Sequence, residues 1–527
     1  MSQQERTIQL LGKLSGRSDL DLSEVLAPGR VGVVLAPEAA DTPQGQLLFS
    51  FVVNLIARLY PVVQQLSIFV GNEHPLRART PRWNGETLSA HLGNMLGAIS
   101  PPVEWCLQDG SNAMISEIDE VLVVGDIQTS GSVYVGCDGW DVLVSSDGPY
   151  SVSTDSNAVS VNVAACFGVS ELFKRLLVRH ASLFSDVPIT PLSGSLTFSA
   201  LTYKVGESQF NPPFPETIDL GRLTLVGLGA GGGATAYTLA SVAGLRGHVN
   251  VIEPDEIIEQ NLNRYVFADA KDASNKRKKA DIIAELLGSS PGISLSAFSK
   301  PWSEVIPNLQ VEDFQQVSAA VHSRAARREL QYETPLVLWD AAASEDGEFR
   351  IWRHTFGQSD CMFCKHPSGE QDPERGRALQ LATVLGLSAE LLMEKIRKND
   401  TFTVEECEAI QRHVDDTHEF DLPSPSQRLD DWESAQCGKL HVRTVDEDVP
   451  IPFSPVMAGV LIAGEIIKER VFPESVLDSY YFNTLLGRFM TRMVPNRRRP
   501  RAGCEHCSDA DFQAQHHRRW ARAVDGD

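Results

Sequence analysis

The chain has 527 residues, of which 42% are hydrophobic and 22% charged, a composition typical of folded globular domains. A single hydrophobic core seldom serves more than about 300 residues, so this length predicts two or more domains. The formal charge of −22 disfavours binding to nucleic acid, because phosphate backbones are bound by basic surfaces. The most apolar window, Val456–Ile467, contains Glu465 and is shorter than the roughly 20 residues that span a bilayer. We therefore expect a cytoplasmic protein without a membrane segment.

Residues 1–205 are predicted to form an N-terminal α/β domain. Apolar runs with strand periodicity occupy 31–35, 66–70, 121–124, 132–135 and 140–144, and helical periodicity occupies 47–60 and 161–178. This half contains no complete glycine fingerprint. Three prolines within 206–218 predict a linker after it.

A nucleotide-binding βαβ unit is predicted to begin after the linker. The apolar strand Leu223–Val226 precedes the loop Gly227-Leu228-Gly229-Ala230-Gly231-Gly232, and a small-residue helix, 234–243, follows it. Glycines at Gly227, Gly229 and Gly232 permit a tight turn and a close approach of phosphates to the helix N-terminus. Further strands at 249–252, 319–321 and 335–339 and a helix at 278–287 predict a doubly wound, Rossmann-like sheet across 206–364.

An acidic residue ends the second strand of this unit. Glu253 stands where an acid can bond ribose hydroxyls, an arrangement that a nicotinamide dehydrogenase would also satisfy. The chain continues through Asp255 to Asn261-Leu262-Asn263-Arg264, and Lys279 opens the next helix. This acid-x-acid, Asn-Leu-Asn-Arg and lysine pattern resembles the E1/ThiF superfamily, which activates ubiquitin and its sulfur-carrier relatives.

The resemblance implies ATP and Mg²⁺ as cofactors. In the superfamily the asparagine, arginine and lysine converge on the triphosphate, which makes Arg264 and Lys279 catalytic candidates as well as binding residues. Guanidinium and ammonium groups can neutralise phosphate charge while pyrophosphate leaves. A dehydrogenase has no use for such cations.

One position departs from the superfamily's pattern. Alignment on Arg327 places His322 where the family carries an aspartate that helps to position magnesium. Neutral imidazole is a poor ligand for Mg²⁺, which prefers oxygen. Asp255 or Asp340 could serve instead, the alignment could be displaced, or adenylation could be impaired. We expect an active enzyme.

Two Cys-x-x-Cys pairs predict a structural zinc site. Cys361 and Cys364 form one pair, and Cys504 and Cys507 form the other. Four thiolates complete a tetrahedral site when the pairs meet in space, so His506 is not expected to be a ligand. Several E1-like proteins show the same arrangement.

The polar segment 365–450 is predicted to be a helical insertion that carries the catalytic cysteine. Ubiquitin-type E1 enzymes capture the adenylate as a thioester, and Cys437, in Gln-Cys-Gly-Lys, is the best candidate for this thiol. Cys166 is predicted to lie in the core. Cys407 lies among glutamates, which raise the pKa of a thiol. An unreactive Cys437 remains the alternative.

The remaining segments complete the prediction. Residues 451–510 are expected to return to the adenylation domain with a proline-bearing loop and a small-residue helix, and 511–527 to form a basic tail. The N-terminal half resembles the inactive adenylation half of ubiquitin-type E1 enzymes, which would make the chain a pseudo-dimer and leaves homodimerisation open. An unrelated α/β domain is the alternative for this half.

The resemblance implies an E1-like enzyme of a bacterial conjugation pathway. It would adenylate a ubiquitin-like protein that ends in glycine and pass it through a thioester to an E2-like protein. The alternatives are a sulfur-carrier or peptide adenylating enzyme without thioester chemistry, and a catalytically impaired scaffold that binds a ubiquitin-like partner.

Overall fold

The computed structural model describes residues 5–15, 26–27, 29–71, 74–109, 118–184, 189–206, 210–321, 324–343, 347–355, 359–366, 373–398, 400–414, 421–435, 451–477, 479–484, 501 and 503–524. Two compact units divide the chain. The larger unit comprises Met1–Ala320, Val337–Arg353 and Val449–Asn496, and the smaller comprises Val321–Leu336, His354–Asp448 and Arg497–Asp527.

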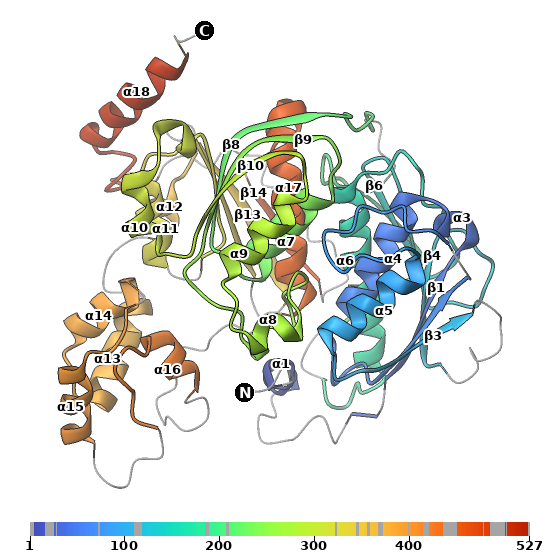
Figure 1. Ribbon diagram of the computed structural model, residues 1–527, viewed down its shortest axis with the longest axis horizontal. Coiled ribbons are helices and arrows are strands. Elements are labelled where there is room, and N and C mark those ends of the chain that lie inside the picture. The colour runs from blue at the N-terminus through green and yellow to red at the C-terminus, as the bar shows by residue number, and fades with distance from the viewer. Residues whose placement is uncertain are drawn as a thin grey trace. The chain divides into compact units, whose positions relative to one another are not determined.

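The larger unit contains two seven-stranded sheets with the same order of strands (Figure 1). The first sheet has the order β3-β2-β1-β4-β5-β6-β7, with β1 Arg30–Leu35, β2 Gln65–Val70, β3 Glu104–Asp109, β4 Glu120–Val124, β5 Val133–Asp138, β6 Asp141–Ser145 and β7 Ser195–Ser199. The second has the order β10-β9-β8-β11-β12-β13-β14, with β8 Ile218–Val226, β9 Leu245–Ile252, β10 Gly292–Phe298, β11 Gln316–Ala319, β12 Val337–Ala343, β13 Glu348–Thr355 and β14 Ser479–Asn483.

Strand directions and helices repeat as well. The first five strands of each sheet in chain order pair in parallel, and the last two strands pair with each other antiparallel. Helix α4 (Pro43–Ile56) follows β1 as α7 (Ala230–Ser241) follows β8, and the long helices α6 (Ala158–Val178) and α17 (Phe453–Val471) each precede a last strand. The prediction of a Rossmann-like fold joined to an N-terminal α/β half is confirmed.

Both halves also repeat a buried ion pair that sequence inspection missed. On each long helix a glutamate pairs with the lysine three residues later and accepts the backbone N–H of a leucine just ahead of the last strand. The two sets are Glu171–Lys174 with Leu192 at 2.7 Å, and Glu465–Lys468 with Leu477 at 3.1 Å. A buried charge is costly without such partners, so the repeat fixes how each helix meets its sheet.

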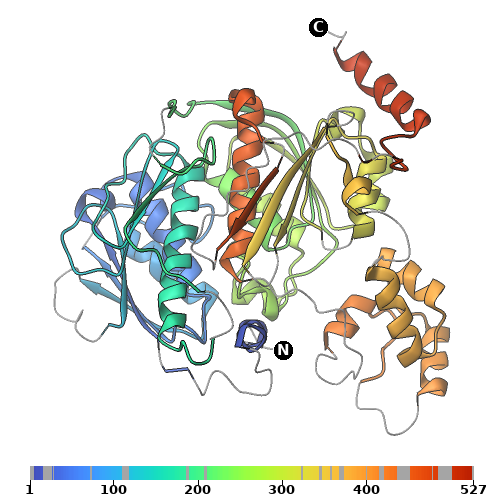
Figure 2. The same ribbon diagram turned by 180° about the vertical axis from the view of Figure 1, so that it is seen from behind.

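The two halves pack against each other through the long helices and an aromatic cluster. Figures 1 and 2 show α6 and α17 side by side. Beside them the Phe167 and Phe482 rings lie 5.2 Å apart between centroids, and the Tyr203 and Tyr480 rings 4.5 Å apart. The core of the larger unit is therefore continuous across both halves.

Several strands differ from their predicted bounds, and β8 and β11 show why. β8 starts at Ile218 rather than Leu223, because a register shift between Asp219 and Arg222, with Gly221 at a φ of +64°, lets polar residues enter the strand. β11 spans Gln316–Ala319 rather than 319–321, since the polar Gln316 and Ser318 are buried in the middle of the sheet and mask its pattern.

The smaller unit is mostly helical, and its segment His354–Asp448 covers nearly all of the predicted insertion 365–450. Trp432, fully buried, lies in its apolar cluster with Leu381, Leu392, Phe402 and Ile410. Its helices are α11 Arg324–Tyr332, α12 Met362–Lys365, α13 Pro373–Leu385, α14 Ala389–Lys398, α15 Val404–His413, α16 Leu429–Ala435 and α18 Ala510–Val524.

The larger unit adds shorter elements, namely α1 Glu5–Ser15, α3 Pro37–Ala40, α5 Leu88–Ile99, η2 Glu259–Asn261, α8 Ala270–Ser274, α9 Lys279–Gly288, α10 Trp302–Val305, η3 Ile306–Asn308, η4 Val311–Phe314 and η5 Pro473–Ser475. Within the described residues, no helix combines the length and apolarity needed to cross a membrane.

Candidate functional site

The glycine loop connects β8 to α7 in the second half. Gly227 has a φ of +81°, a left-handed conformation that favours glycine. A Cβ atom on Gly232 would lie 1.9 Å from the Gly227 carbonyl oxygen, so this position requires glycine as well. Gly229 is the N-cap residue of α7. The loop therefore presents a helix N-terminus, where backbone N–H groups and the helix dipole favour phosphate.

Glu253 follows β9 and is buried against this loop. Its Oε2 accepts the Leu228 N–H at 2.6 Å, and its Oε1 accepts the Asp255 N–H at 3.1 Å. Burial raises the pKa of the Glu253 carboxyl group, while Lys279, with its Nζ 3.9 Å away, acts in the opposite direction. Each carboxylate oxygen can accept a second hydrogen bond, so Glu253 can fix the turn and still bond a ribose hydroxyl.

Lys279 and Arg264 are brought together on one aromatic ring. The Lys279 Nζ and the Arg264 Cζ each lie 5.4 Å from the ring centroid of Tyr265, and both side chains are buried. Lys279 also contacts the Asp255 carboxylate at 3.1 Å, and Arg264 donates to the Asn263 Oδ1 at 2.8 Å.

Burial lowers the pKa of Lys279, but the neighbouring phenol and carboxylates outweigh it and hold this pKa above its ordinary value. The ammonium group is thus charged at neutral pH. Two cations thus lie on one ring beside the glycine loop, with Asp255 and Glu253 as the acidic neighbours of Lys279, and both cations have the chemistry to pair with phosphate.

Asn261 and Tyr265 belong to the segment that carries Arg264. The Asn261 Oδ1 accepts the Ile258 N–H at 3.1 Å and closes the short helix η2. The Tyr265 hydroxyl lies 3.6 Å from the Cβ position of Gly229, so its ring adjoins the glycine loop. Sequence inspection missed Tyr265, although an aromatic residue directly after the arginine predicted to bind phosphate was its visible signal.

The predicted nucleotide residues therefore lie together, whereas two other predicted residues cannot be placed. His322 and Cys437 lie outside the described residues. Asp340 is fully buried on β12, in register with Ala319 of β11. The exposed side of the site offers the carboxylate of Asp255, which is 37% exposed. Carboxylate oxygens are the ligands that Mg²⁺ prefers, so the residues present fit the magnesium ion that ATP brings.

The described cysteines outside the Cys-x-x-Cys pairs differ in environment. Cys137 and Cys166 are fully buried, and Cys106 is exposed on the edge strand β3. Burial and the Glu406 carboxylate raise the pKa of the Cys407 thiol, which disfavours its thiolate at neutral pH.

The two Cys-x-x-Cys pairs meet in the smaller unit. Neighbouring sulfur atoms lie 3.7 to 3.8 Å apart, and all four lie within 4.8 Å of one another. A zinc ion about 2.3 Å from each sulfur would separate tetrahedral sulfurs by about 3.8 Å, so these residues fit zinc. The Arg501 N–H points at the Cys364 sulfur at 3.2 Å, and the Cys507 N–H at the Cys504 sulfur at 3.5 Å.

His506 lies beside the four cysteines but is not among the residues whose ligand atoms cluster there. Its ring stacks on Phe363 with 5.1 Å between centroids and contacts Phe512 at 4.6 Å. Burial lowers the pKa of His506 to about 4, so the neutral ring packs as an aromatic residue beside the cysteines.

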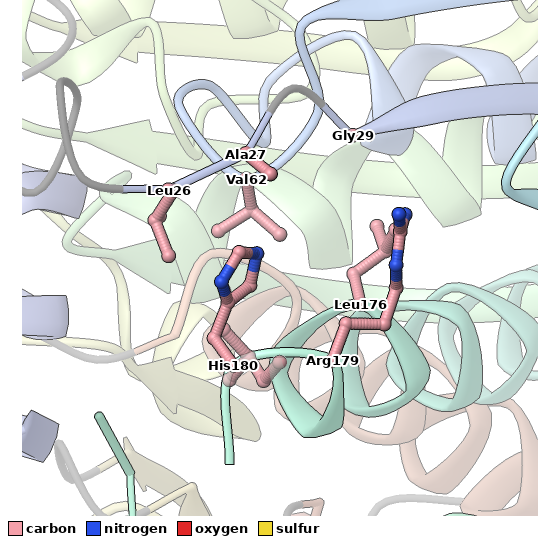
Figure 3. A pocket seen from close by; sticks show the side chains of 8 residues that line it. Leu26, Ala27, Gly29, Val62, Leu176, Arg179 and His180 are labelled. Atoms are coloured by element: carbon pink, nitrogen blue, oxygen red, sulfur yellow. The ribbon is translucent and has the colours of Figure 1, made fainter. Parts of the chain in front are cut away.

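A small hollow opens at the end of α6 in the first half (Figure 3). Leu26, Val62, Leu176 and His180 line it, and none of the predicted site residues does. Its charged or titratable lining side chains are Arg179 and His180, neither of them a predicted site residue, and the glycine loop remains the candidate site.

The chain is similar to known proteins at three levels, namely a family, a relative along the whole chain and a solved structure. Residues 205–505, more than half of the chain, match the ThiF family. An uncharacterised protein of Sinorhizobium fredii, y4jF, is 25% identical over 528 residues, covering 96% of this chain and 94% of the relative. The crystal structure of Escherichia coli MccB with MccA-N7isoASN matches at a TM-score of 0.33 and 16% identity, over 55% of this chain and 67% of that one. On the extent of the family match, the chain belongs to the ThiF family and is an adenylating enzyme of that family.

Proposed function

We propose that this protein uses Mg·ATP to adenylate the C-terminal carboxylate of a ubiquitin-like protein that ends in glycine. The arrangement that carries the proposal is the pair Arg264 and Lys279 on the Tyr265 ring, beside the glycine loop. These two cations suit the charge of a triphosphate.

The carboxylate oxygen of the carrier attacks the α-phosphorus of ATP, and the bond from that phosphorus to the bridging oxygen of the β-phosphate breaks. Pyrophosphate leaves with the electron pair of that bond. Arg264 and Lys279 hold the β- and γ-phosphates and neutralise the charge that develops there. The N-terminus of α7 holds phosphate oxygens, and Glu253 bonds the ribose. Asp255 would hold Mg²⁺, which supplies further charge neutralisation. The carrier carboxylate is already ionised at neutral pH, so no general base is needed.

A cysteine thiolate then takes the acyl group, which releases AMP and forms a thioester. We assign this step to Cys437, since Lys439 follows it closely in the sequence and a nearby cation lowers a thiol pKa. Cys407 is the poorer candidate because its pKa is raised. An E2-like protein would receive the acyl group on its own cysteine. The four paired cysteines would hold a structural zinc ion, because four protein thiolates leave no position for water.

Pyrophosphate exchange tests the first step. The purified protein is incubated with Mg·ATP, labelled pyrophosphate and a small ubiquitin-like protein with a C-terminal glycine that is encoded beside its gene. Label should enter ATP only when the carrier keeps its last glycine. No exchange with an intact carrier would contradict adenylation and favour a scaffold. Recovery of exchange in His322→Asp would place the defect at that position.

The second step is tested by a covalent adduct between carrier and enzyme. Incubation with carrier and ATP should give a band that thiol reagents remove, and Cys437→Ser should abolish that band or convert it to a thiol-resistant ester. Cys106→Ser and Cys407→Ser are the controls and should keep it. Exchange without any adduct would identify a carrier- or peptide-adenylating enzyme that lacks the thioester step.

A further inference from the structure

We infer that Arg58 and Asn54, which belong to the first half, are positioning residues for the nucleotide site of the second half. They hold segment 262–268, which directly follows Asn261 and carries Arg264 and Tyr265. The inference rests on the proposed function in so far as ATP is the ligand of that site.

Arg58 and Asn54 donate hydrogen bonds to three backbone carbonyl groups of this segment. The Arg58 Nη1 donates to the Leu262 carbonyl, and its Nη2 donates to the Ala268 carbonyl at 3.0 Å. The Arg58 Nε donates to the Asn54 Oδ1 at 2.8 Å, and the Asn54 Nδ2 donates to the Val266 carbonyl at 2.9 Å. One guanidinium group and one amide thus fix the segment at both ends and near its middle.

The burial of this arginine indicates that the arrangement is specific. Arg58 is 2% exposed and Asn54 is fully buried. Moving a charged group out of water costs several kcal/mol unless hydrogen bonds compensate it. An apolar side chain would fill the same space between the two halves without this cost. The planar guanidinium group instead donates hydrogen bonds in fixed directions. It therefore specifies where the carbonyl groups of segment 262–268 lie, which an apolar side chain that only filled the space would not do.

The position of this segment sets the position of Arg264 and of the Tyr265 ring, which Lys279 also contacts. The Tyr265 ring stacks on Phe267 with 5.4 Å between centroids, and a Cβ on Gly233 would lie 1.9 Å from the Phe267 ring. Segment 262–268 is therefore packed directly on the first turn of α7, with Arg264 between the two ends that Arg58 holds. Misplacement of a binding group by about 1 Å can cost about a hundredfold in rate.

A second arginine of the first half strengthens the same attachment. Arg82 donates to the Phe267 carbonyl and pairs with Asp272 at 2.6 Å and with Asp269 at 3.2 Å. Asp269 is the N-cap residue of α8. The anchored stretch thus extends from Leu262 to Asp272, and the first half contributes to the nucleotide site from a distance.

Arg79 offers a matched control. It also crosses between the halves, donating to the Ala240 carbonyl at 2.8 Å and to the Ser290 Oγ at 2.7 Å, but it does not contact segment 262–268. We would measure the affinity of the full-length protein for Mg·ATP by titration calorimetry, and the KM for ATP and kcat of pyrophosphate exchange. Arg58→Met should weaken ATP binding and raise this KM about tenfold or more, Arg58→Lys should recover part of both, and Arg79→Met should stay within about twofold of wild type.

Melting temperatures of all variants separate positioning from unfolding. If Arg58→Met does not fold, Asn54→Ala and Arg58→Lys give the same comparison. Wild-type affinity in Arg58→Met, or in both substitutes, would overturn the positioning role and leave the adenylation proposal intact. An equal loss in Arg79→Met would overturn it too, because any weakening of the contact between the halves would then suffice. Wild-type protein that binds no ATP would overturn both proposals.

Discussion

Replacement of Lys279 is the most direct test of the nucleotide site. Its ammonium group lies 3.1 Å from the Asp255 carboxylate and 3.9 Å from that of Glu253, so its removal leaves two carboxylates facing the bound triphosphate. The interaction energy of two unit charges about 4 Å apart is about 4 kcal/mol at an effective dielectric constant near 20. Loss of a single donor to developing charge costs about 100- to 1,000-fold in rate. We therefore expect Lys279→Met to lower the rate of pyrophosphate exchange by about two to three orders of magnitude.

The neighbouring lysine provides the control for this experiment. Lys278 is 37% exposed and pairs with Glu256 at 3.1 Å, so Lys278→Met should stay within about twofold of wild type, as exposed pairs contribute little. The double variant Lys279→Met with Glu253→Gln removes the buried carboxylate and should regain stability without regaining activity. Equal losses in Lys278→Met and Lys279→Met, or near-normal exchange in Lys279→Met, would refute the placement of the triphosphate at Lys279.

Three further predictions concern the loop, the metal and the buried acid. Gly232→Ala should abolish ATP binding in calorimetry, since its Cβ would lie 1.9 Å from the Gly227 oxygen, whereas Gly231→Ala, with 3.4 Å to the Pro455 oxygen, should bind with only a modest loss. The protein should carry about one zinc ion per chain by elemental analysis; Cys504→Ser should lose it and melt at a lower temperature, and Cys407→Ser should keep it. Burial raises the folded-state pKa of Glu253, so its contribution to stability is complete below the unfolded value near ~4.3 and is lost as the pH rises through the folded value. Glu253→Gln should flatten this decline in melting curves from pH 4 upwards, and parallel curves would contradict it.

Local patterns made the nucleotide loop predictable from the sequence. Gly227 and Gly232 are required by a turn whose geometry depends on a few consecutive residues, and Glu253 and Lys279 follow at element ends, where function-bearing residues recur. The zinc pairs were predictable for a different reason. A Cys-x-x-Cys turn is a local ligand unit, and only the meeting of Cys361 with Cys504 required the fold.

Residues that act across the fold could not be predicted in this way. Arg58 and Asn54 lie more than 200 positions from the carbonyl groups they hold, and an arginine and an asparagine near the end of an apolar helix carry no local signal for that role. The buried pair Glu465–Lys468 was likewise not evident in a segment expected only to form a small-residue helix. β11 was misplaced because Gln316 and Ser318 are polar yet buried. In each case tertiary contacts decided the outcome.

The repeated architecture leads to a division of tasks between the halves. In the second half Gly232 lies next to Ala320, the residue just after β11, and a Cβ atom placed on Gly232 would lie 3.2 Å from the Ala320 Cβ. In the first half Gly125 holds the matching position, directly after β4. A Cβ atom placed on Gly125 would lie only 2.7 Å from the Cβ of Ala36 and 2.9 Å from that of Ala39, two residues at the start of α3. The four-residue helix α3 therefore fills the space that a phosphate loop would need. Under the proposed function the second half would bind phosphate, and Arg58 of the first half, which donates to the Leu262 carbonyl, would position the segment that carries Arg264.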